Sequence, residues 1–446
     1  MTETDVHQSA PDARTRADIC IIGAGSSGVA VAKALKQQGL AFDCFEKGSD
    51  IGGMWRYEND NGLSSAYASL HIDTSRENLG YPDFPLPKTC PDFPSHRDFL
   101  RHLEAYADHF GIRPLITFRT SVEEVTPAED ERWRVRLDSG ETRTYDSVIV
   151  ANGHLWDPRW PDFPGKFHGH QIHSHHYRTA APFEGKDVLV VGLGNSAVDI
   201  AVDLCRRASS VTISTRRSAW IMPKYLMGIP VDRWSAFLSR RLRLPTRLTR
   251  TLMSKLIRLA VGDQSRFGVP RPAHPMWREH ATLSQELLPY IGHGWIAVKP
   301  DIARLDGEHV HFKDGSSQRF DAIIHATGYK ASFPFLSPEV FHVGKEGADL
   351  YRRMVLPDRP GLFFAGLVQP IGPTIPLVEI QARWIASVLS KRMTLPGREE
   401  IRREIEHHRE RQRKTYLDSA RYALEVDFKT YAAQMNRDMQ TGRAGV

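Results

Sequence analysis

The chain has 446 residues, of which 41% are hydrophobic and 25% charged, and its formal net charge is +6. This length suits two domains, and so modest a charge does not by itself indicate a nucleic-acid-binding protein. No apolar run is long enough to predict a transmembrane helix, and the polar segment 1–17 is expected to be a disordered N-terminus. The four cysteines form no Cys-x-x-Cys pair, so we expect a cytoplasmic protein with neither a disulfide framework nor a cysteine zinc site.

The first chemical motif is a glycine-rich turn near the N-terminus. A short apolar run leads into Gly23-x-Gly25-x-x-Gly28, a helical pattern follows as far as Gly39, and the next strand, 42–45, ends in Glu46. Such glycines permit a tight turn, close approach of the backbone to a pyrophosphate, and packing of helix on strand, while the acid accepts from ribose hydroxyls. The predicted dinucleotide site comprises Gly23, Gly25, Ser27, Gly28, Glu46 and Lys47.

Residues 187–197 repeat the pattern as Gly192-x-Gly194-x-x-Ala197. Where the first unit has its acid, the second has Thr215 followed by Arg216 and Arg217. A missing carboxylate and an added guanidinium suit a 2′-phosphate and favour NADPH over NADH, although the arginines could also be solvated surface charge. The predicted second site comprises Gly192, Gly194, Asn195, Ser196, Ala197, Asp199, Arg216 and Arg217.

Two further predicted strands end in small residues, one at Asn152-Gly153 and one at Thr327-Gly328. Turns at Asp306-Gly307 and Asp314-Gly315 predict hairpins before the second of these strands. We expect the two strand ends to carry the chain between domains.

Between the glycine motifs lies Phe167-x-Gly169-x-x-x-His173-x-x-x-Tyr177-Arg178, which resembles the fingerprint of the flavin-containing monooxygenases. The similarity continues in order along residues 18–390, and this order makes it specific. Its further segments are 52–55, 83–85, 326–329, 363–370 and 381–384. Type I Baeyer–Villiger monooxygenases fit less well, because their fingerprint ends in Trp-Pro, and disulfide reductases need a redox dithiol that is absent.

The resemblance implies an α/β fold of two doubly wound Rossmann-like dinucleotide-binding domains, with the smaller NADPH domain inserted in the FAD domain. The expected boundaries are 18–165 for the first part of the FAD domain, 166–330 for the NADPH domain with a helical insertion at about 225–295, and 331–446 for the second FAD part with C-terminal helices. FAD would occupy the first glycine site and NADPH the second.

The chemistry implied by the resemblance is oxygenation. Flavin reduced by NADPH would react with O2 to form a C4a-hydroperoxyflavin, which would oxygenate a nucleophilic nitrogen or sulfur of a small organic substrate. The alternatives are Baeyer–Villiger oxygenation of ketones to esters or lactones, and a non-oxygenating NADPH flavin reductase or oxidase. The family resemblance makes Asp73 and Gln369 the candidate catalytic residues. It also implies cofactor contacts by Gly53, Met54, Trp55, Asp73, Thr74, Thr327, Gly328 and Gln369.

Asp73 departs from the family, which usually has asparagine there. An amide can donate hydrogen bonds, whereas an ionised carboxylate can only accept. An anion near the flavin would disfavour the anionic, ketone-attacking oxygen species, so Asp73 favours oxygenation of nitrogen or sulfur. The alternative is that Asp73 is a loop carboxylate that caps a turn.

The segment 233–261 is rich in basic residues, has no acid before Asp263, and is interrupted by Pro245. One interpretation is a peripheral membrane contact. The interpretation we favour is an insertion that packs over the active-site mouth or forms a homodimer contact. No metal is expected, because the fingerprint accounts for His173 in the histidine-rich stretch 168–176, and the segment from Gly397 is predicted to be a solvated helix.

Overall fold

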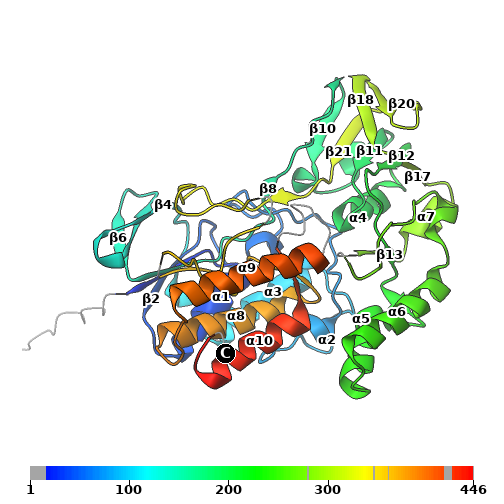
Figure 1. The fold of residues 1–446 in the computed structure, drawn as a ribbon. Coiled ribbons are helices and arrows are strands. Elements are labelled where there is room, and N and C mark those ends of the chain that lie inside the picture. Colours follow the sequence, from blue (N-terminus) through cyan, green and yellow to red (C-terminus); the bar gives the residue numbers. More distant parts are fainter. Residues whose placement is uncertain (1–16, 279–280, 345–346, 360, 416–423, 445–446) are drawn as a thin grey trace, which may run out of the picture.

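The computed structural model describes residues 17–278, 281–344, 347–359, 361–415 and 424–444. The predicted disordered segment 1–17 lies outside the described residues except for Ala17. Figure 1 shows two lobes: a blue, cyan, orange and red one built from both ends of the chain, and a green and yellow one built from its middle.

The first lobe is built on a parallel sheet of five strands in the order β23-β7-β1-β2-β3. Its strands are β1 (Ile19–Ile22), β2 (Phe42–Phe45), β3 (Ile116–Thr117), β7 (Ser147–Val150) and β23 (Leu362–Phe364). The late strand β23 pairs with β7, from Leu362 opposite Val148 to Phe364 opposite Val150. The end of the chain therefore returns to complete the first domain, as the predicted insertion topology requires.

Helices cover this sheet, and α1 follows the first glycine turn directly (Figure 1). Residues 28–35 of α1 are all buried, and the helix stops before Gly39, whose φ of +71° suits a glycine. The C-terminal helix α8 packs along α1. The helices of this lobe are α1 (Ser26–Gln37), α2 (Arg76–Leu79), α3 (His96–His109), α8 (Thr374–Leu389), α9 (Arg398–Thr415) and α10 (Phe428–Thr441).

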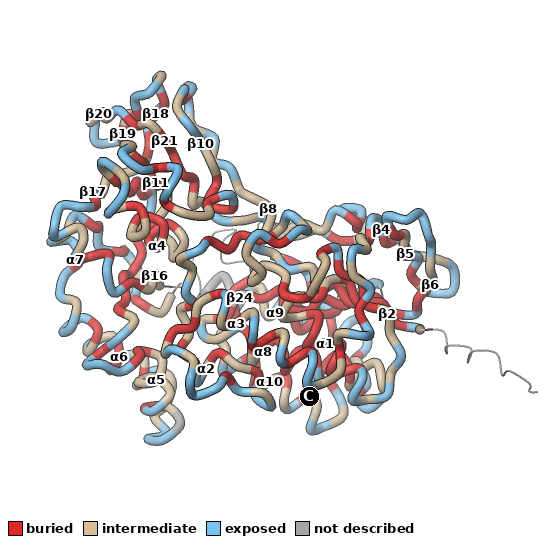
Figure 2. The backbone as a smooth tube through the Cα atoms, turned by 180° about the vertical axis from the view of Figure 1, so that it is seen from behind, coloured by how far each residue is buried: buried red, intermediate tan, exposed pale blue. Residues whose placement is uncertain are grey.

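The second lobe is built on another parallel sheet of five strands, in the order β10-β21-β11-β12-β17. Its strands are β10 (His170–His173), β11 (Asp187–Val191), β12 (Ser210–Ser214), β17 (Ile296–Lys299) and β21 (Ala322–His325), and its helices are α4 (Asn195–Leu204) and α7 (Leu287–Gly292). In Figure 2 the strands of both sheets are mostly buried, so each lobe has a core of its own. Two doubly wound nucleotide-binding folds, one inserted in the other, are thus confirmed.

Small antiparallel sheets flank the two lobes. The predicted hairpins are present as β18-β19-β20, with β9 alongside β18. The bounds of these and the remaining strands are β4 (Val122–Pro127), β5 (Trp133–Leu137), β6 (Thr142–Tyr145), β9 (Gly165–Phe167), β18 (Ile302–Gly307), β19 (His309–Phe312), β20 (Ser317–Arg319), β24 (Gln369–Ile371) and β25 (Glu425–Asp427).

The two connections between the lobes run side by side. β8 (Asp157–Pro158) leaves the first lobe, β22 (Tyr329–Lys330) returns to it, and the two pair antiparallel. The hydroxyl of Thr327 donates to the carbonyl of Arg159 at 2.6 Å, which adds a side-chain contact between the connections. The strand ends predicted to carry the chain between domains therefore form one paired crossing (Figure 1).

The insertion in the second lobe is less uniformly helical than the sequence suggested. It contains β13 (Ile221–Met222), β14 (Tyr225–Leu226), β15 (Ile229–Pro230), α5 (Val231–Ala236), a π-turn at Phe237–Arg241, α6 (Thr246–Val261) and β16 (Thr282–Leu283). Pro245 stands directly before α6, where its missing N–H costs no helical hydrogen bond. Helix α6 buries Thr249, Met253 and Ile257, and no helix among the described residues is long and apolar enough to cross a membrane.

Candidate functional site

The first glycine turn is built as its spacing predicts. Gly23 has a φ of +99°, and a Cβ there would lie 2.8 Å from the carbonyl oxygen of Ala151 on the neighbouring strand. A Cβ on Gly28 would lie 1.8 Å from the carbonyl oxygen of Gly23, so this glycine lets α1 pack against the turn. A Cβ on Gly25 would meet only the Cα of Gly53, at 3.7 Å. Gly25 and Gly53 thus present two bare stretches of backbone to one another.

The start of α1 is suited to an anion. Helix α1 has Gly25 as its N-cap, without a side-chain cap and without an acidic residue in the first turn. Its first N–H groups, which have no partner within the helix, are therefore not taken by a side-chain cap. This is the arrangement that binds a pyrophosphate at a helix N-terminus.

Glu46 lies beside this turn, directly after β2. Its carboxylate is buried and accepts from the backbone N–H of Ala24 at 2.7 Å and of Gly48 at 2.8 Å, and from the amide of Asn61 at 3.3 Å. A carboxylate has about four acceptor positions, so one remains for a ribose hydroxyl. The glycines, the helix start and this acid together fit the adenosine diphosphate part of FAD.

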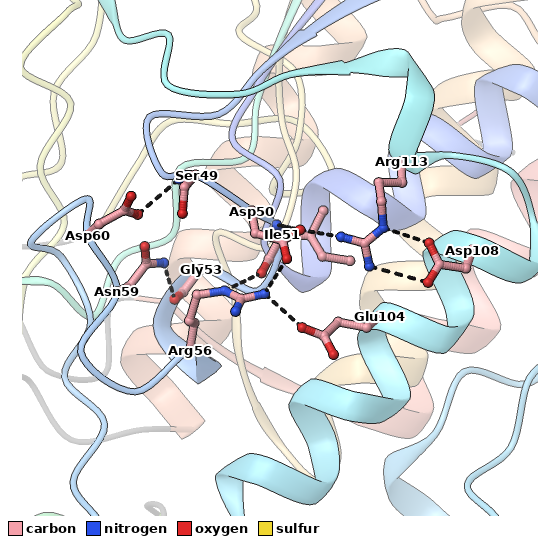
Figure 3. A network of polar contacts seen from close by, with 10 residues as sticks. All are labelled: Ser49, Asp50, Ile51, Gly53, Arg56, Asn59, Asp60, Glu104, Asp108 and Arg113. Atoms are coloured by element: carbon pink, nitrogen blue, oxygen red, sulfur yellow. Dashed lines mark hydrogen bonds and ion pairs between the residues drawn. The ribbon is translucent and has the colours of Figure 1, made fainter.

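The loop after Glu46 is fixed in place by charged side chains (Figure 3). The Arg56 guanidinium lies 3.0 Å from the carboxylate of Asp50 within the loop and 2.8 Å from Glu104 of α3. The amide of Asn59 donates to the carbonyl of Gly53 at 3.0 Å. These contacts fix the turn that carries Gly53, Met54 and Trp55 against the helix behind it.

The second glycine turn repeats the geometry of the first. Gly192 has a φ of +131°, and a Cβ there would lie 2.5 Å from the carbonyl oxygen of Ala326. Helix α4 likewise starts after a glycine, Gly194, with no side-chain cap and no acid in its first turn. Ser196 and Ala197 belong to that first turn. The structure therefore offers a second helix start suited to a dinucleotide pyrophosphate.

Arg216 and Arg217 are exposed just beyond the end of β12, next to the second turn. Thr215, in the position that Glu46 occupies in the first turn, is buried, and its hydroxyl donates to the carbonyl of Arg217 at 2.6 Å. Among the residues that the structure describes, this position after β12 holds a hydroxyl in place of the carboxylate that would repel a 2′-phosphate. Recognition of that phosphate by the two arginines stays a prediction.

Side chains from the two lobes meet at the interface between them. Tyr67 of the first lobe donates its hydroxyl proton to the carboxylate of Asp199 on α4, at 2.9 Å. Asp73 of the first lobe lies 3.2 Å from the ammonium of Lys224 in the insertion of the second. These four residues, here called the interdomain cluster, contain two of the predicted site residues, Asp73 and Asp199.

The charged groups of the interdomain cluster shift one another's pKa. Burial, followed by the nearby Asp73 carboxylate, raises the pKa of Asp199 to about 7. Burial opposes the charging of Lys224, but Asp73 and Asp199 outweigh it, so the pKa of Lys224 is raised. Burial and Asp199 together raise the pKa of Tyr67. Lys224 therefore carries its charge at neutral pH, while Asp199 titrates near neutrality.

A family model described as flavin-binding monooxygenase-like matches residues 16–442. The chain belongs to this family. Flavin-containing monooxygenase 5 of Oryctolagus cuniculus is 35% identical over 92% of this chain and 80% of its own length, and the protein of the same name from Homo sapiens is 34% identical over 93% and 81%. Dimethylaniline monooxygenase [N-oxide-forming] 2 of Rattus norvegicus is 32% identical over 94% of this chain and 81% of its own length.

Among solved structures, S-allyl-L-cysteine S-oxygenase from Allium sativum superposes with a TM-score of 0.71 at 27% identity, covering 95% of this chain and 88% of the other. Cyclohexanone monooxygenase in an open form gives the same TM-score at 18% identity, covering 96% of this chain and 98% of the other, which shows a shared fold. The chain is thus a flavin monooxygenase that uses FAD and NADPH, and the two glycine turns are the positions that suit these cofactors.

Several of the residues predicted to contact cofactor have protein partners in this monooxygenase. The Asn195 side chain accepts from the backbone of Leu283 at 3.0 Å, and Thr327 contacts the interlobe connection. Ser27 packs against Gly366, where a Cβ would lie 2.2 Å from its hydroxyl. Of the others, Met54, Trp55, Thr74 and Gln369 are partly exposed, Lys47 is exposed, and Gly328 has a φ of +82°.

The fingerprint residues make contacts both within the second lobe and between the lobes. Tyr177 donates its hydroxyl proton to Asp203 at 2.6 Å, and Arg178 reaches the carbonyl of Ser64 in the first lobe at 3.0 Å. His173 is fully buried, and burial lowers its pKa to about 4, so it is neutral at physiological pH. Within the described residues no group of three or more metal-ligating side chains is assembled.

A pocket of about 320 Å³ opens in the second lobe and is mostly apolar. Its lining includes Pro223 and Tyr225, the two neighbours of Lys224, and none of the predicted cofactor residues. The lining also includes Ile221, Leu226, Met227, Ala260, Val261, Phe267, Ser284, Gln285, Leu288 and Pro289. The insertion that the family resemblance covers least thus builds both this pocket and one side of the interdomain cluster.

Lys224 and Tyr67 were not predicted as site residues. Nothing in the local sequence marks them, because each acquires its partner only when the two lobes come together. The one available signal was Asp73 itself, since a carboxylate in place of an amide at a partly buried position calls for a compensating cation.

Proposed function

We propose that the enzyme catalyses NADPH- and O2-dependent oxygenation of a nucleophilic nitrogen or sulfur in a small organic molecule. The observation that carries the proposal is the pair of glycine turns, each at the start of an uncapped helix, the first followed by the buried acid Glu46 and the second by Thr215. Bound flavin would supply the oxygen-activating chemistry, and the protein would orient it and exclude water. The names of relatives that form N-oxides or S-oxygenate support nitrogen and sulfur as the targets.

The test is product formation under ¹⁸O2 with purified, FAD-loaded enzyme and NADPH. A tertiary arylamine, an alkyl aryl sulfide and a cyclic ketone are supplied in parallel, and products are examined by mass spectrometry. We expect one ¹⁸O atom in the N-oxide or sulfoxide. Oxidation of NADPH with hydrogen peroxide as the sole oxygen product would overturn the proposal and support the reductase or oxidase alternative.

Ketone oxygenation is the second candidate, and Lys224 is the observation that favours it. The sequence argument against a ketone substrate assumed an anion at Asp73 without a cation beside it. The ammonium 3.2 Å away offsets that charge, so the carboxylate no longer argues against an anionic oxidant. An ester or lactone from the ketone in the same panel would identify this activity.

The partner and location proposals concern the insertion and the cysteines. Exposed apolar side chains of segment 233–261 lie among exposed arginines, and they support contact with an anionic membrane surface. The exposed apolar residues are Phe237, Leu242, Leu248 and Leu259. Sedimentation with anionic vesicles at low salt and release at high salt are expected, and a vesicle-independent dimer in light scattering would favour self-association instead.

All four cysteines are free thiols, which supports a cytoplasmic location.

A further inference from the structure

Lys224 lies at the centre of a chain of polar groups that joins the two nucleotide-binding lobes. Its ammonium is 3.2 Å from Asp73 of the first lobe, and the Lys224 side chain is only 14% exposed. Asp199 and Glu286 of the second lobe are close enough to act on its charge. The ammonium therefore pairs with one carboxylate across the interface, and two carboxylates of its own lobe also act on its charge.

Hydrogen bonds hold the backbone around Lys224, and two groups of the first lobe lie close to its ammonium. The Lys224 carbonyl accepts from the N–H of Val231 at 3.0 Å, and the N–H of Tyr225 donates to the side chain of Gln285 at 3.1 Å. The Lys224 ammonium also lies 5.7 Å from the centre of the Phe93 ring in the first lobe, within the range of a cation–π contact.

The same two segments contact one another beyond this pair. The N–H of Ser75 donates to the carboxylate of Asp232 at 2.9 Å, and Arg233 lies 2.6 Å from Asp92. The insertion therefore contacts the segment that follows Asp73 at two further points, Ser75 and Asp92. Lys224 differs from Arg233 because its partner is Asp73 itself and because Asp199 of α4 acts on its charge.

We propose that Lys224 is a positioning residue for catalysis, whose ammonium pairs with Asp73 across the interface and so fixes the segment that carries Asp73 relative to the second lobe. Without its ammonium, two carboxylates from opposite lobes would face each other with Tyr67 between them. Like charges at a partly buried interface repel, and the lobes would separate or take up a proton. The inference rests on the proposed function, since it concerns turnover at the same site.

The test compares Lys224→Met, Lys224→Arg and the double variant Asp73→Asn/Lys224→Met in FAD-loaded enzyme. Methionine keeps the length and apolar stem of lysine without its charge, and the double variant removes the carboxylate that needed the charge. Arg233→Met is the matched control, because it removes a cation between the same two segments but outside the cluster. Flavin absorbance and circular dichroism check that each variant is folded and loaded.

Three quantities are measured for each variant: the rate of anaerobic flavin reduction by NADPH, the fraction of NADPH converted to hydrogen peroxide, and the pH profile of reduction. We expect Lys224→Met to slow reduction roughly 10- to 100-fold, as expected for misplacement of reacting groups by about 1 Å. Its profile should move to higher pH, since Asp73, Asp199 and Glu286 then lack the neighbouring ammonium. Lys224→Arg should recover most of the rate, the double variant should be reduced faster than Lys224→Met, and Arg233→Met should leave the profile in place.

Reduction by Lys224→Met within twofold of wild type would overturn the inference, as would an equal pH shift in Arg233→Met or a double variant slower than Lys224→Met. If Lys224→Met does not fold, the pH profile of the double variant decides: a profile at the wild-type pH supports the proposal, and one displaced to higher pH opposes it. Anaerobic reduction needs no substrate to be oxygenated. A wild-type enzyme that is reduced by NADPH but oxygenates nothing would therefore end the proposed function and leave this inference open to the same measurements.

Discussion

Replacing Gly25 by alanine is expected to weaken FAD binding without lowering the stability of the apoprotein. Gly25 has φ −75° and ψ −168°, a conformation that any residue adopts, and the new Cβ would make one ordinary contact, at 3.7 Å from the Cα of Gly53. The apoprotein should therefore keep its stability, or gain about 0.4–1 kcal/mol through the loss of freedom in the unfolded chain.

FAD binding by Gly25→Ala should fall sharply, because the methyl group would stand where the pyrophosphate approaches the start of α1. Loss of one hydrogen bond to a charged group costs about 1.5–3 kcal/mol. This corresponds to a roughly 10- to 100-fold rise in Kd for FAD.

Gly28→Ala is the matched control, since its Cβ would lie 1.8 Å from the carbonyl oxygen of Gly23. Forcing a methyl group into packed backbone should lower apoprotein stability by about 1–3 kcal/mol. The assay strips FAD, follows thermal unfolding by circular dichroism, and titrates FAD by fluorescence quenching. Apoprotein of Gly25→Ala that melts as low as Gly28→Ala, or that binds FAD like wild type, would refute the reasoning.

Three further outcomes are expected. Arg216→Ala should raise the KM for NADPH about 10-fold or more while sparing that for NADH, because a guanidinium pairs with the 2′-phosphate that only NADPH carries; equal changes in both would leave the arginine as surface charge. Burial raises the pKa of Asp199 to about 7. Between about pH 4 and 7 the folded protein therefore keeps a proton on Asp199 that the unfolded chain has released. The free energy of unfolding should fall as the pH rises through that range. Asp199→Asn should flatten this fall in urea titrations at several pH values, and an unchanged slope would contradict the assignment. Arg352 is 5% exposed and lies 2.9 Å from the buried carboxylate of Asp438. Arg352→Met should therefore lower the free energy of unfolding by about 3–5 kcal/mol in denaturant titration, because it leaves that carboxylate buried without this cation. A change below about 1 kcal/mol would mean that the charge of Asp438 is neutralised elsewhere.

The parts of the fold that sequence could predict are those set by local geometry. Gly23 and Gly192 each occupy a backbone conformation and a space that only glycine fits, so their spacing specified turn, helix and neighbouring strand together. Glu46 followed from the same unit, because it ends the next strand of the sheet. Order along the chain then gave the inserted topology.

The interdomain cluster was beyond such reasoning because its members lie far apart in sequence. Lys224 belongs to a segment of short strands and helix turns whose path depends on packing, and its partner Asp73 lies in an irregular stretch between η1 (Gly53–Trp55) and α2. Asn195 has a partner that its position at a helix start did not indicate. Its side-chain oxygen accepts from the N–H of Leu283 across the lobe, and its contact with cofactor stays a prediction.

Because β8 and β22 pair, the chain between them forms a lobe whose two ends lie side by side. Asp157 lies opposite Lys330, so the segment between them departs and returns at almost the same point. A donor segment whose ends are equally close could be spliced there without altering the route of the remaining polypeptide. Exchanging this segment between relatives could thus transfer the coenzyme preference of the second lobe and leave the sequence of the first lobe unchanged.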